Sequence, residues 1–284
     1  MNFYTNTILD NHPCFNKKAS ANYGRVHLPV APNCNIQCNF CNRMYDCANE
    51  NRPGVTGRVQ SPDEAVEFVE RLFKFRQDIS VIGIAGPGDP MCDADKTLST
   101  FEKCRSRFAN TMLCLSTNGL ALPEHVDDIV RLGVSHVTVT VNAVTPDIGS
   151  KVYAWVRYKN RNYYAKEGAR ILQECQDEGI RKLKEAGMIV KINTVAIPGV
   201  NMEHIPWIAK KAKDWQVDIM NCMAMIPVHD TPFANIQTPS REEIHHVRKS
   251  IGSTIRQMTH CGRCRADACG KLHENQKELF DDSF

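Results

Sequence analysis

The sequence predicts an α/β protein whose centre is a TIM-type barrel with a core of six β/α units, possibly extended toward eight. Two observations predict this class. Apolar segments with strand character alternate six times with amphipathic helical segments along residues 26–258. The first strand is also not followed by a glycine-rich dinucleotide fingerprint. An open doubly wound sheet is the alternative arrangement that right-handed crossovers allow.

The elements follow one another with recognisable boundaries. A first strand at 26–31 leads into a long loop that contains several cysteines. The first helix begins at Ser61, a good N-cap, because Pro62 suits the first helical position and Glu64 completes a capping box. The other elements are predicted as strands 79–85, 111–116, 136–141, 189–197 and 218–226, helices 94–108, 123–132, 165–186, 203–214 and 241–250, and a weak strand near 254–258.

Three segments make up the expected domain organisation. Residues 1–25 form an irregular N-terminal arm, 26–258 the barrel domain, and 259–284 a C-terminal segment with a Cys-x-x-Cys pair and a polar tail. Within the barrel domain, 142–164 is rich in tyrosine, arginine and lysine and is expected to leave the barrel as an excursion.

Composition narrows the classes of function. The 284 residues are 42% hydrophobic and carry a net charge of +3, which is too small to indicate nucleic acid or a membrane surface. No apolar run approaches the roughly 18 residues that a membrane span needs, and residues 1–10 contain no secretion signal. Thirteen cysteines, an odd number in a large chain, favour metal chemistry over a disulfide framework. We expect a cytoplasmic protein.

The strongest motif is the run Cys34, Cys38 and Cys41 in a C-x3-C-x2-C spacing. Each iron of a [4Fe–4S] cluster normally takes one thiolate, so three cysteines leave one iron open for a small molecule. A zinc site would need a fourth ligand, which Cys47 or the Cys261/Cys264 pair could supply. The position of the run after the first strand of an α/β unit favours the cluster. With Phe40 before its last cysteine, the run resembles the signature of the radical S-adenosylmethionine (SAM) enzymes.

That resemblance implies a SAM site built at the strand ends. In the family the open iron chelates the amino and carboxylate groups of the methionine part of SAM, and a glycine-rich segment after the second strand presents backbone groups to the amino group. Here that segment is Gly86-Pro-Gly88-Asp89-Pro, which could otherwise be a plain turn. Polar residues at other strand ends are the candidates for holding ribose and carboxylate, with loop or capping roles as the alternative: Asn118, Thr140, Asn142 and Asn193. Ile197 could lie against adenine or belong to the core.

Further potential metal ligands are spread over the chain. A lone cysteine is usually a small buried hydrophobe, and this suits Cys104 and Cys175 in predicted helices. That role suits cysteines in loops poorly. His27 on the first strand and Cys114 on the third could also reach the face of the barrel where the cysteine loop lies. The loop cysteines are Cys14, Cys47, Cys261 and Cys264.

Several segments together are similar to the NifB family of nitrogenase cofactor biosynthesis proteins. They extend from the His12-Pro-Cys14 run to the end of the C-terminal motif, and so cover nearly the whole chain: 12–14, 31–55, 86–90, 140–143, 153–156 and 261–268. The similarity implies fusion of two [4Fe–4S] clusters into an eight-iron, carbide-centred precursor. One SAM would donate a methyl group to a cluster sulfide, and a second would give the 5′-deoxyadenosyl radical that takes hydrogen from it.

The same similarity implies three clusters and a ligand set for each. Cys34, Cys38 and Cys41 would hold the SAM-binding cluster. One substrate cluster would take His27, Cys261 and Cys264, and the other Cys14, Cys47 and Cys114. Cys222 and Cys269 are extra to the pattern and could compete as ligands.

Partners are implied too. They are scaffold and carrier proteins of nitrogenase assembly, cluster-donating proteins and an electron donor. Because some members append a carrier domain that is expected to be missing here, a separate carrier would receive the product. Two other hypotheses remain open at this point. One is a radical SAM enzyme that acts on an organic substrate with auxiliary clusters, and the other is a non-catalytic cluster carrier or zinc-stabilised module.

Overall fold

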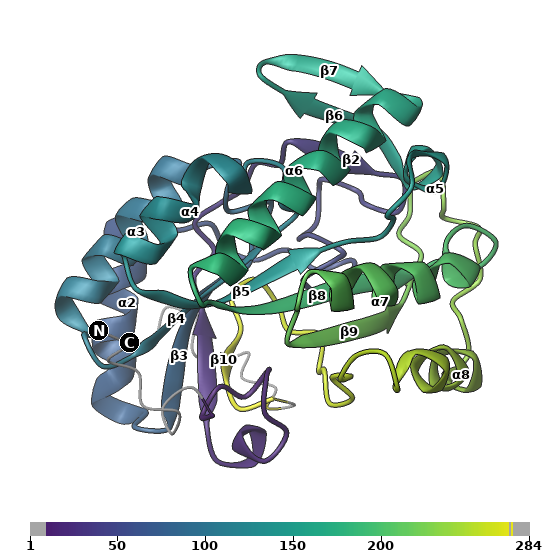
Figure 1. The fold of residues 1–284 in the computed structure, drawn as a ribbon. Helices are drawn as coiled ribbons and strands as arrows, with labels where there is room; N and C mark the ends of the chain where they lie inside the picture. Colours follow the sequence, from purple (N-terminus) through teal and green to yellow (C-terminus); the bar gives the residue numbers. More distant parts are fainter. Residues whose placement is uncertain (1–9, 273, 275–284) are drawn as a thin grey trace.

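The computed structural model describes residues 10–272 and 274, and its centre is one curled, mostly parallel sheet (Figure 1). The strand order is β10-β1-β3-β4-β5-β8-β9, and all neighbours from β1 to β9 run parallel. The strands are β1 (Gly24–His27), β3 (Ile79–Ile84), β4 (Met112–Thr117), β5 (Val134–Thr140), β8 (Ile189–Ala196), β9 (Ile219–Ala224) and β10 (Cys269–Gly270). The six parallel strands confirm the predicted core.

The sheet forms half a barrel. Among the described residues β9 and β10 are its two edges, so the predicted extension toward eight units is not found there. Among the described residues, the one strand that this sheet contains beyond the six is β10, which pairs antiparallel with β1 and was not predicted.

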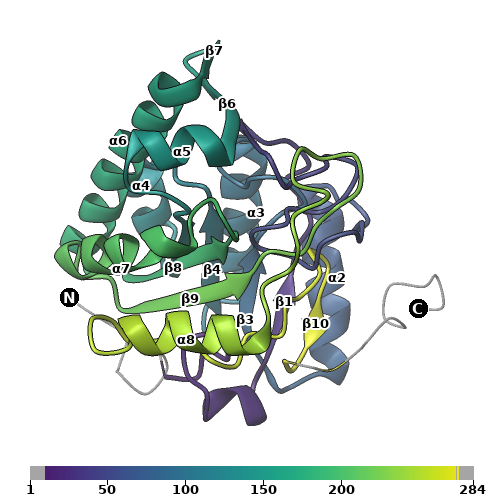
Figure 2. The same cartoon turned by 90° about the vertical axis from the view of Figure 1, so that its right-hand side faces the viewer.

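Helices cover the outer face of the sheet (Figure 2). They are α2 (Pro62–Phe75), α3 (Ala94–Arg107), α4 (Leu122–Arg131), α6 (Ala165–Glu185), α7 (Ile205–Asp214) and α8 (Arg241–Ile251), with short 3-10 turns η1 (Ala19–Ala21) and η2 (Met202–His204). Ser61 and Glu64 form the predicted capping box at the start of α2. Ser240 and Glu243 form a second box at α8.

The strands alternate between an apolar outer side and a polar inner side. On β4 and β8, Leu113 and Val190 belong to the core under the helices, while their neighbours Cys114 and Lys191 line an inner cavity. Successive side chains of a strand point to opposite faces, which explains the pattern. The strands are therefore buried on both sides, and the inner side is where polar groups gather.

The predicted excursion at 142–164 is real but more regular than expected. It contains α5 (Pro146–Val152) and a hairpin of β6 (Tyr153–Tyr158) and β7 (Arg161–Tyr164). The hairpin joins β2 (Ile36–Cys38), inside the cysteine loop, in a second sheet of order β2-β6-β7. The cysteine loop is thus anchored by backbone pairing, such as Ile36 opposite Val156.

Two predicted strands need correction. The first strand ends at His27 instead of Ala31. Beyond His27 the chain leaves the regular strand pairing, and Ala31 forms an isolated bridge with Pro87. The expected strand at 254–258 is reduced to one bridge, Gln257 to Met220. Here the chain touches β9 for a single residue and does not extend the sheet.

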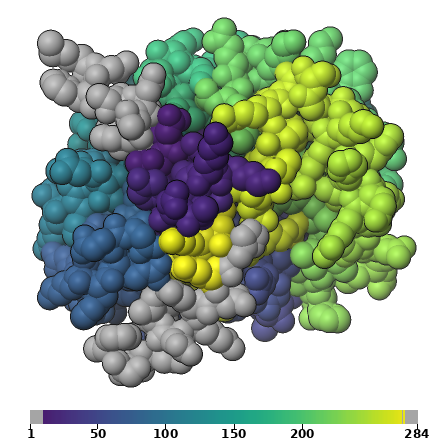
Figure 3. All heavy atoms as spheres, turned by 90° about the horizontal axis from the view of Figure 1, so that it is seen from below, coloured from purple at the N-terminus to yellow at the C-terminus, as the bar shows by residue number. Residues whose placement is uncertain are grey.

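The described part of the N-terminal arm packs against the C-terminal segment. Figure 3 shows the purple residues of the arm beside the yellow C-terminal residues on one face of the molecule. His260 Nε2 lies 2.9 Å from the carbonyl oxygen of Pro13, and Arg256 donates to the carbonyl of Phe15 at 3.1 Å. The arm and the C-terminal segment therefore close the lower part of the half-barrel together.

Among residues 10–272 and 274, none of the helices combines the length and apolar character that a membrane crossing requires.

Candidate active site

Two adjoining cavities lie on the inner side of the half-barrel, and Glu50 and Ser116 line both. The first cavity lies at the cysteine loop and is lined by Cys34, Ile36, Cys38, Cys41, Arg43, Cys47, Asn49, Gly88, Asp89, Asn118 and Thr140. The second lies deeper, between the inner strand faces and the two chain ends. Its polar and sulfur-bearing lining is His12, Cys14, Arg25, His27, Cys114, Thr138, Lys191, Asn193, Asn221, Met223, Met258, Cys261 and Cys264.

The three cysteines of the C-x3-C-x2-C run do meet at the first cavity, as predicted. Cys38 is 3% exposed, and burial raises the pKa of Cys34 and Cys38 well above the ordinary thiol value. Metal binding must therefore displace protons from these thiols. Amide donors approach the sulfurs, with Asn118 Nδ2 at 3.8 Å from Cys34 Sγ and Asn49 Nδ2 at 3.6 Å from Cys38 Sγ. Such donors stabilise thiolate ligands.

The spacing of the donors bears on the zinc alternative. Within the part of the chain that the structure describes, no three histidine, cysteine, aspartate or glutamate side chains converge closely enough to hold one metal ion. A zinc ion needs four ligands at about 2.0–2.3 Å. A four-iron cube is held at separate corners, so its cysteines stand further apart. Cys34, Cys38 and Cys41 would each hold one corner of such a cube.

The Gly86–Asp89 segment is packed tightly against the chain that leads into the cysteine loop. A Cβ on Gly88 would lie 1.9 Å from the carbonyl oxygen of Asn33. The N–H groups of Gly88 and Asp89 donate to Ala31 and Asn33, and the Gly86 carbonyl accepts from Ala31. These backbone groups are bonded within the protein. The structure thus assigns this segment a role in placing the loop, and direct contact with SAM stays a prediction.

Asp89 organises the end of β4. Its carboxylate accepts hydrogen bonds from Thr117 Oγ1 at 2.9 Å and from the backbone N–H of Met91 at 3.0 Å and of Asn118. Burial raises the pKa of Asp89, and these donors oppose that shift. Asn118 is held beside Cys34 as a result.

The other predicted SAM contacts divide between three places. Asn118 and Thr140 line the first cavity, whereas Asn193 lines the second. Asn142 lies behind the first cavity, where its Nδ2 donates to Asn49 Oδ1 at 2.9 Å. Ile197 is fully buried in a cluster with Cys38 and lines neither cavity. Contact with SAM stays a prediction at all five positions, of which Asn118 and Thr140 line the first cavity.

Five of the six predicted outer ligands line the second cavity: Cys14, His27, Cys114, Cys261 and Cys264. Cys47 instead lines the first cavity, with Asn49 Nδ2 3.7 Å from its sulfur. The expected grouping of Cys47 with Cys14 and Cys114 is therefore not seen in the described structure. The division into two ligand sets stays a prediction.

His27 has the tautomer of a ligand. Its Nδ1 lies 3.3 Å from the carbonyl oxygen of Arg265, which can only accept, so Nδ1 carries the hydrogen and Nε2 keeps its lone pair. Burial, and then nearby Arg25, lower the pKa of His27 to about 3 and keep the ring neutral. A backbone carbonyl that accepts from the opposite ring nitrogen is usual for metal-binding histidines.

The remaining cysteines lie outside both cavities. Cys104 and Cys175 are buried in the helix layer, as expected of small hydrophobes. Cys222 and Cys269 are also buried, and both belong to the core between sheet and helices. Their expected competition as ligands has no support from this placement.

Five charged or titratable residues of the cavities were missed from the sequence, and one of them, Arg43, lines the first cavity. Glu50 joins both cavities, accepts from Asn193 Nδ2 at 2.7 Å and from Thr140, and has its pKa raised by burial. Arg25 donates to Cys264 Sγ at 2.8 Å. Lys191 and His12 line the second cavity. A polar residue at every second position of an otherwise apolar strand was the available signal for Arg25 and Lys191.

A scan against protein families matches residues 28–212 to the radical SAM superfamily. The chain is 43% identical over 273 residues to the FeMo cofactor biosynthesis protein NifB of Chlorobaculum tepidum, covering 96% of this chain and 64% of that protein. It is 42% identical over 273 residues to the protein of the same name from Klebsiella pneumoniae, covering 95% and 58%. The chain thus spans about three fifths of the length of these relatives.

Solved structures share the fold. Streptococcus suis SuiB bound to S-adenosylmethionine aligns with a TM-score of 0.57 and 13% identity, over 89% of this chain and 55% of that one. Methylornithine synthase PylB aligns with a TM-score of 0.57 and 14% identity, over 88% and 67%. At this identity the likeness concerns the half-barrel and its arrangement of strands.

Proposed function

This chain belongs to the radical SAM superfamily and is similar to NifB over nearly its whole length, and from that premise we propose that it builds the nitrogenase cofactor precursor. The superfamily implies one [4Fe–4S] cluster and SAM. In the proposed reaction, two substrate [4Fe–4S] clusters become an eight-iron, carbide-centred product. A methyl group passes from SAM to a cluster sulfide, and a 5′-deoxyadenosyl radical then takes hydrogen from that methyl.

The single observation that carries the proposal is the pair of adjoining cavities. One is lined by the three-cysteine run and the other by a ligand-type histidine and four cysteines, with Glu50 and Ser116 between them. A radical SAM enzyme for an organic substrate needs one cysteine-lined cavity and a substrate pocket. A second, sulfur-rich cavity against the first fits a substrate that is itself an iron–sulfur cluster.

The chain's own residues do the positioning. Cys34, Cys38 and Cys41 would hold three corners of the SAM-binding cluster, while Asn49 and Asn118 direct amide N–H groups at the sulfurs. The cofactor supplies the radical chemistry when bound, and the protein orients it and excludes water. Buried Ile36 lines the cavity and belongs to the same hydrophobic cluster as buried Phe40.

The second cavity would hold the substrate clusters through few ligands. His27, Cys114, Cys261, Cys264 and Cys14 are the candidates, with Cys47 reaching from the first cavity. Product must leave, and a small number of protein ligands lets it do so. We propose three clusters in all, delivered by cluster-donating proteins, reduced through an electron donor, and passed on to scaffold and carrier proteins.

Two products of SAM test the reaction. After anaerobic reconstitution, we expect iron and acid-labile sulfide well beyond one four-iron cluster per chain. Incubation with SAM and a reductant should give both S-adenosylhomocysteine, from methyl loss, and 5′-deoxyadenosine. The reconstituted chain should also mature a nitrogenase that lacks its cofactor.

Other outcomes would replace the proposal. Iron for one cluster only, together with full maturation activity, contradicts the substrate-cluster site. Formation of 5′-deoxyadenosine without any loss of methyl from SAM indicates an organic substrate instead.

A further inference from the structure

The second cavity contains an unusual number of polar atoms without partners. Four buried side-chain atoms on its lining have no hydrogen-bond partner among residues 10–272 and 274: His12 Nε2, Arg25 Nε, Thr138 Oγ1 and Asn221 Oδ1. Leaving such a group unsatisfied costs about 1–3 kcal/mol, so proteins rarely do it without a reason. Four of them around one cavity indicate a bound group that completes their hydrogen bonds.

His12 is fixed as a donor toward that group. The backbone N–H of Cys14 donates to His12 Nδ1 at 3.1 Å. A backbone N–H cannot accept, so Nδ1 holds the lone pair and Nε2 carries the hydrogen. This is the opposite tautomer to His27, whose Nε2 is free to bind metal. His12 is therefore set to donate a hydrogen bond and not to ligate iron.

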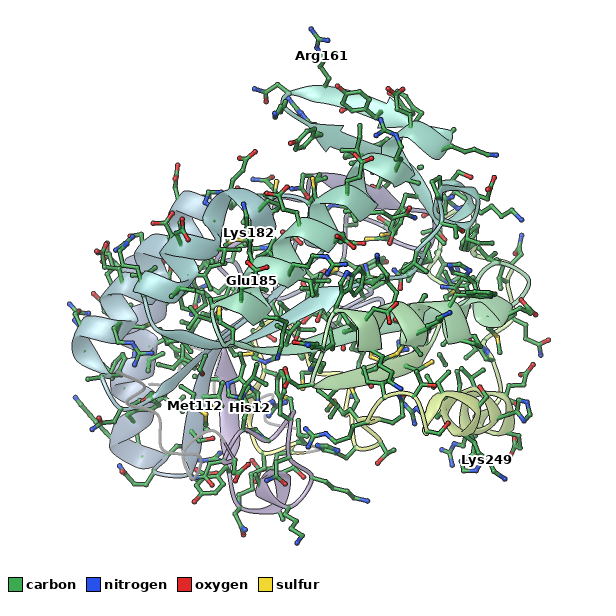
Figure 4. All side chains as sticks on the ribbon, viewed as in Figure 1. His12, Met112, Arg161, Lys182, Glu185 and Lys249 are labelled. Atoms are coloured by element: carbon green, nitrogen blue, oxygen red, sulfur yellow. The ribbon has the colours of Figure 1, made fainter. Side chains whose placement is uncertain are left out.

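The position of His12 is set by packing. Its ring lies 4.4 Å from that of His136 and 4.6 Å from that of Phe15, measured between centroids. Figure 4 labels it near the lower part of the sheet, where the N-terminal arm turns inward. The contacts fix the ring plane, and with it the direction of the unpartnered N–H.

Lys191 adds a cation to the same wall. It is 7% exposed, on the inner face of β8, with its ammonium 5.0 Å from the centre of the Phe15 ring. The groups whose negative charge would act on this ammonium are the thiols of Cys14, Cys114 and Cys261 and the carboxyl of Glu50. Burying a lysine is costly unless a negative group neutralises it.

Of the four unpartnered atoms, His12 Nε2, Arg25 Nε and Thr138 Oγ1 can donate, whereas Asn221 Oδ1 can only accept, and Glu50 adds a carboxyl to the lining. A group that accepts hydrogen bonds suits most of them. His12, Arg25, Lys191 and Thr138 bring N–H or O–H groups, and Arg25 and Lys191 bring positive charge. A thiolate-bound iron–sulfur cluster is an anion whose sulfides accept N–H hydrogen bonds, and such bonds help set its potential.

We propose that His12 and Lys191 bind the iron–sulfur substrate directly, each donating an N–H to one of its sulfides beside the thiolate ligands. This role rests on the proposed function, since it requires a cluster in the second cavity. It assigns recognition to two residues that are not iron ligands. The cluster would then stay in place while protein–iron bonds are exchanged during fusion.

The test compares variants that remove the donor with variants that keep it. His12→Phe keeps the ring packing and loses the N–H, whereas His12→Gln keeps an amide donor. Lys191→Met keeps the unbranched stem, whereas Lys191→Arg keeps N–H groups and charge. Lys182→Met, on the surface helix α6 in Figure 4, is the control for loss of one lysine.

Each full-length variant is reconstituted anaerobically and desalted, and its iron, sulfide and cluster potential are measured. We expect His12→Phe and Lys191→Met to retain the substrate cluster roughly tenfold more weakly, the order for one charge-assisted hydrogen bond. Any cluster that remains should have a lower midpoint potential, because N–H donors favour the more negative, reduced state. The control Lys182→Met should match the parent chain in iron, sulfide and cluster potential.

The outcomes separate the two proposals. If the parent chain holds iron for one cluster only, the proposed function fails. If the parent holds more and His12→Phe and Lys191→Met match it in iron and potential, the hydrogen-bonding role is wrong. It is equally wrong if His12→Gln and Lys191→Arg lose as much cluster as the variants without a donor, since packing would then explain the loss.

Discussion

At the scale of single residues, what matters most is where each polar atom finds its partner. Cys34, Cys38 and Cys41 could be identified as a group from spacing alone, because they lie close together in one loop. The tautomers of His12 and His27 could not be predicted from the sequence. Each depends on a backbone group of another residue, the N–H of Cys14 for His12 and the carbonyl of Arg265 for His27. Opposite roles for two buried histidines follow from those single contacts.

Gly88 gives a prediction at this scale. In Gly88→Ala the new Cβ would meet the Asn33 carbonyl at 1.9 Å, so the segment before Cys34 must move. We expect a loss of about 3 kcal/mol or more in the free energy of unfolding, at the upper end for overpacking. Urea unfolding measures it.

The matched control for Gly88→Ala is Gly252→Ala. Gly252 has φ of −64°, which alanine adopts easily, and a Cβ there would lie 3.3 Å from the carbonyl oxygen of Arg248. The free energy of unfolding should be unchanged or slightly higher, because alanine has fewer conformations than glycine in the unfolded chain. Equal losses in the two variants would contradict the steric argument.

Asn49 gives the second prediction. Asn49→Leu removes the amide N–H that lies 3.6 Å from Cys38 Sγ and 3.7 Å from Cys47 Sγ. We expect a lower midpoint potential of the SAM-binding cluster, since hydrogen bonds to sulfur favour its reduced form. A redox titration followed by EPR measures it. Asn162→Leu, on the exposed strand β7, should leave the potential unchanged, and a shift of the same size there would sink the idea.

At the scale of elements, local signals placed the helices well and the irregular strands poorly. The capping box at Ser61 located the start of α2 to within a residue, since that signal lies at the helix terminus itself. The hairpin β6–β7 was not predicted, because its partner β2 lies more than a hundred residues earlier in the chain. Strand pairing over that distance leaves no local pattern.

Asp177 on α6 gives a prediction at this scale. Although partial burial opposes it, hydrogen bonds from Arg181, Lys211 and Trp215 hold the pKa of Asp177 below its ordinary value. A lowered folded-state pKa stabilises the protein above the ordinary value of about 3.9, and that stability is lost as the pH falls below it. Asp177→Asn should cost about 1 kcal/mol at pH 7, after allowance for solvent screening, because it loosens α6 from α7.

The pH dependence checks this account. Thermal unfolding of Asp177→Asn should differ from that of the parent at pH 7, and the difference should shrink as the pH falls below about 4. Asp147→Asn, which breaks an exposed pair with Lys166, is the control and should have little effect at any pH. A constant difference from pH 7 to pH 3 would show that charge is not the cause.

At the scale of the whole molecule, the N-terminal arm and the C-terminal segment complete the lining of the second cavity. Cys14 comes from the N-terminal arm, Cys261 and Cys264 come from the C-terminal segment, and all three line one cavity with the sheet. Asp46 connects the cysteine loop to the C-terminal segment through hydrogen bonds. It is 1% exposed and accepts from the N–H of Gly57 at 2.8 Å and of Ala266 at 3.3 Å.

The prediction at this scale concerns the loss of the two hydrogen bonds that Asp46 accepts. Asp46→Ala should cost about 2 kcal/mol, the order for buried hydrogen bonds to a charged group. It should also speed hydrogen exchange at residues 264–268, because the C-terminal segment loses an anchor to the loop. Asp63→Ala, which removes an exposed ion pair with Lys103, should change neither quantity. Unaltered exchange in Asp46→Ala would mean that the segment is held by other contacts.

The six β/α units and the three-cysteine loop with its radical SAM signature could be predicted without a structure, because those signals lie within short stretches of chain. The position of Cys47 at the first cavity, the burial of Cys222 and Cys269 in the core, and the inward direction of Arg25 and Lys191 became known from the folded chain. The reason is physical. Which side of a strand faces the cavity, and which distant loop meets it, depends on the curl of the sheet and on contacts between residues far apart in sequence.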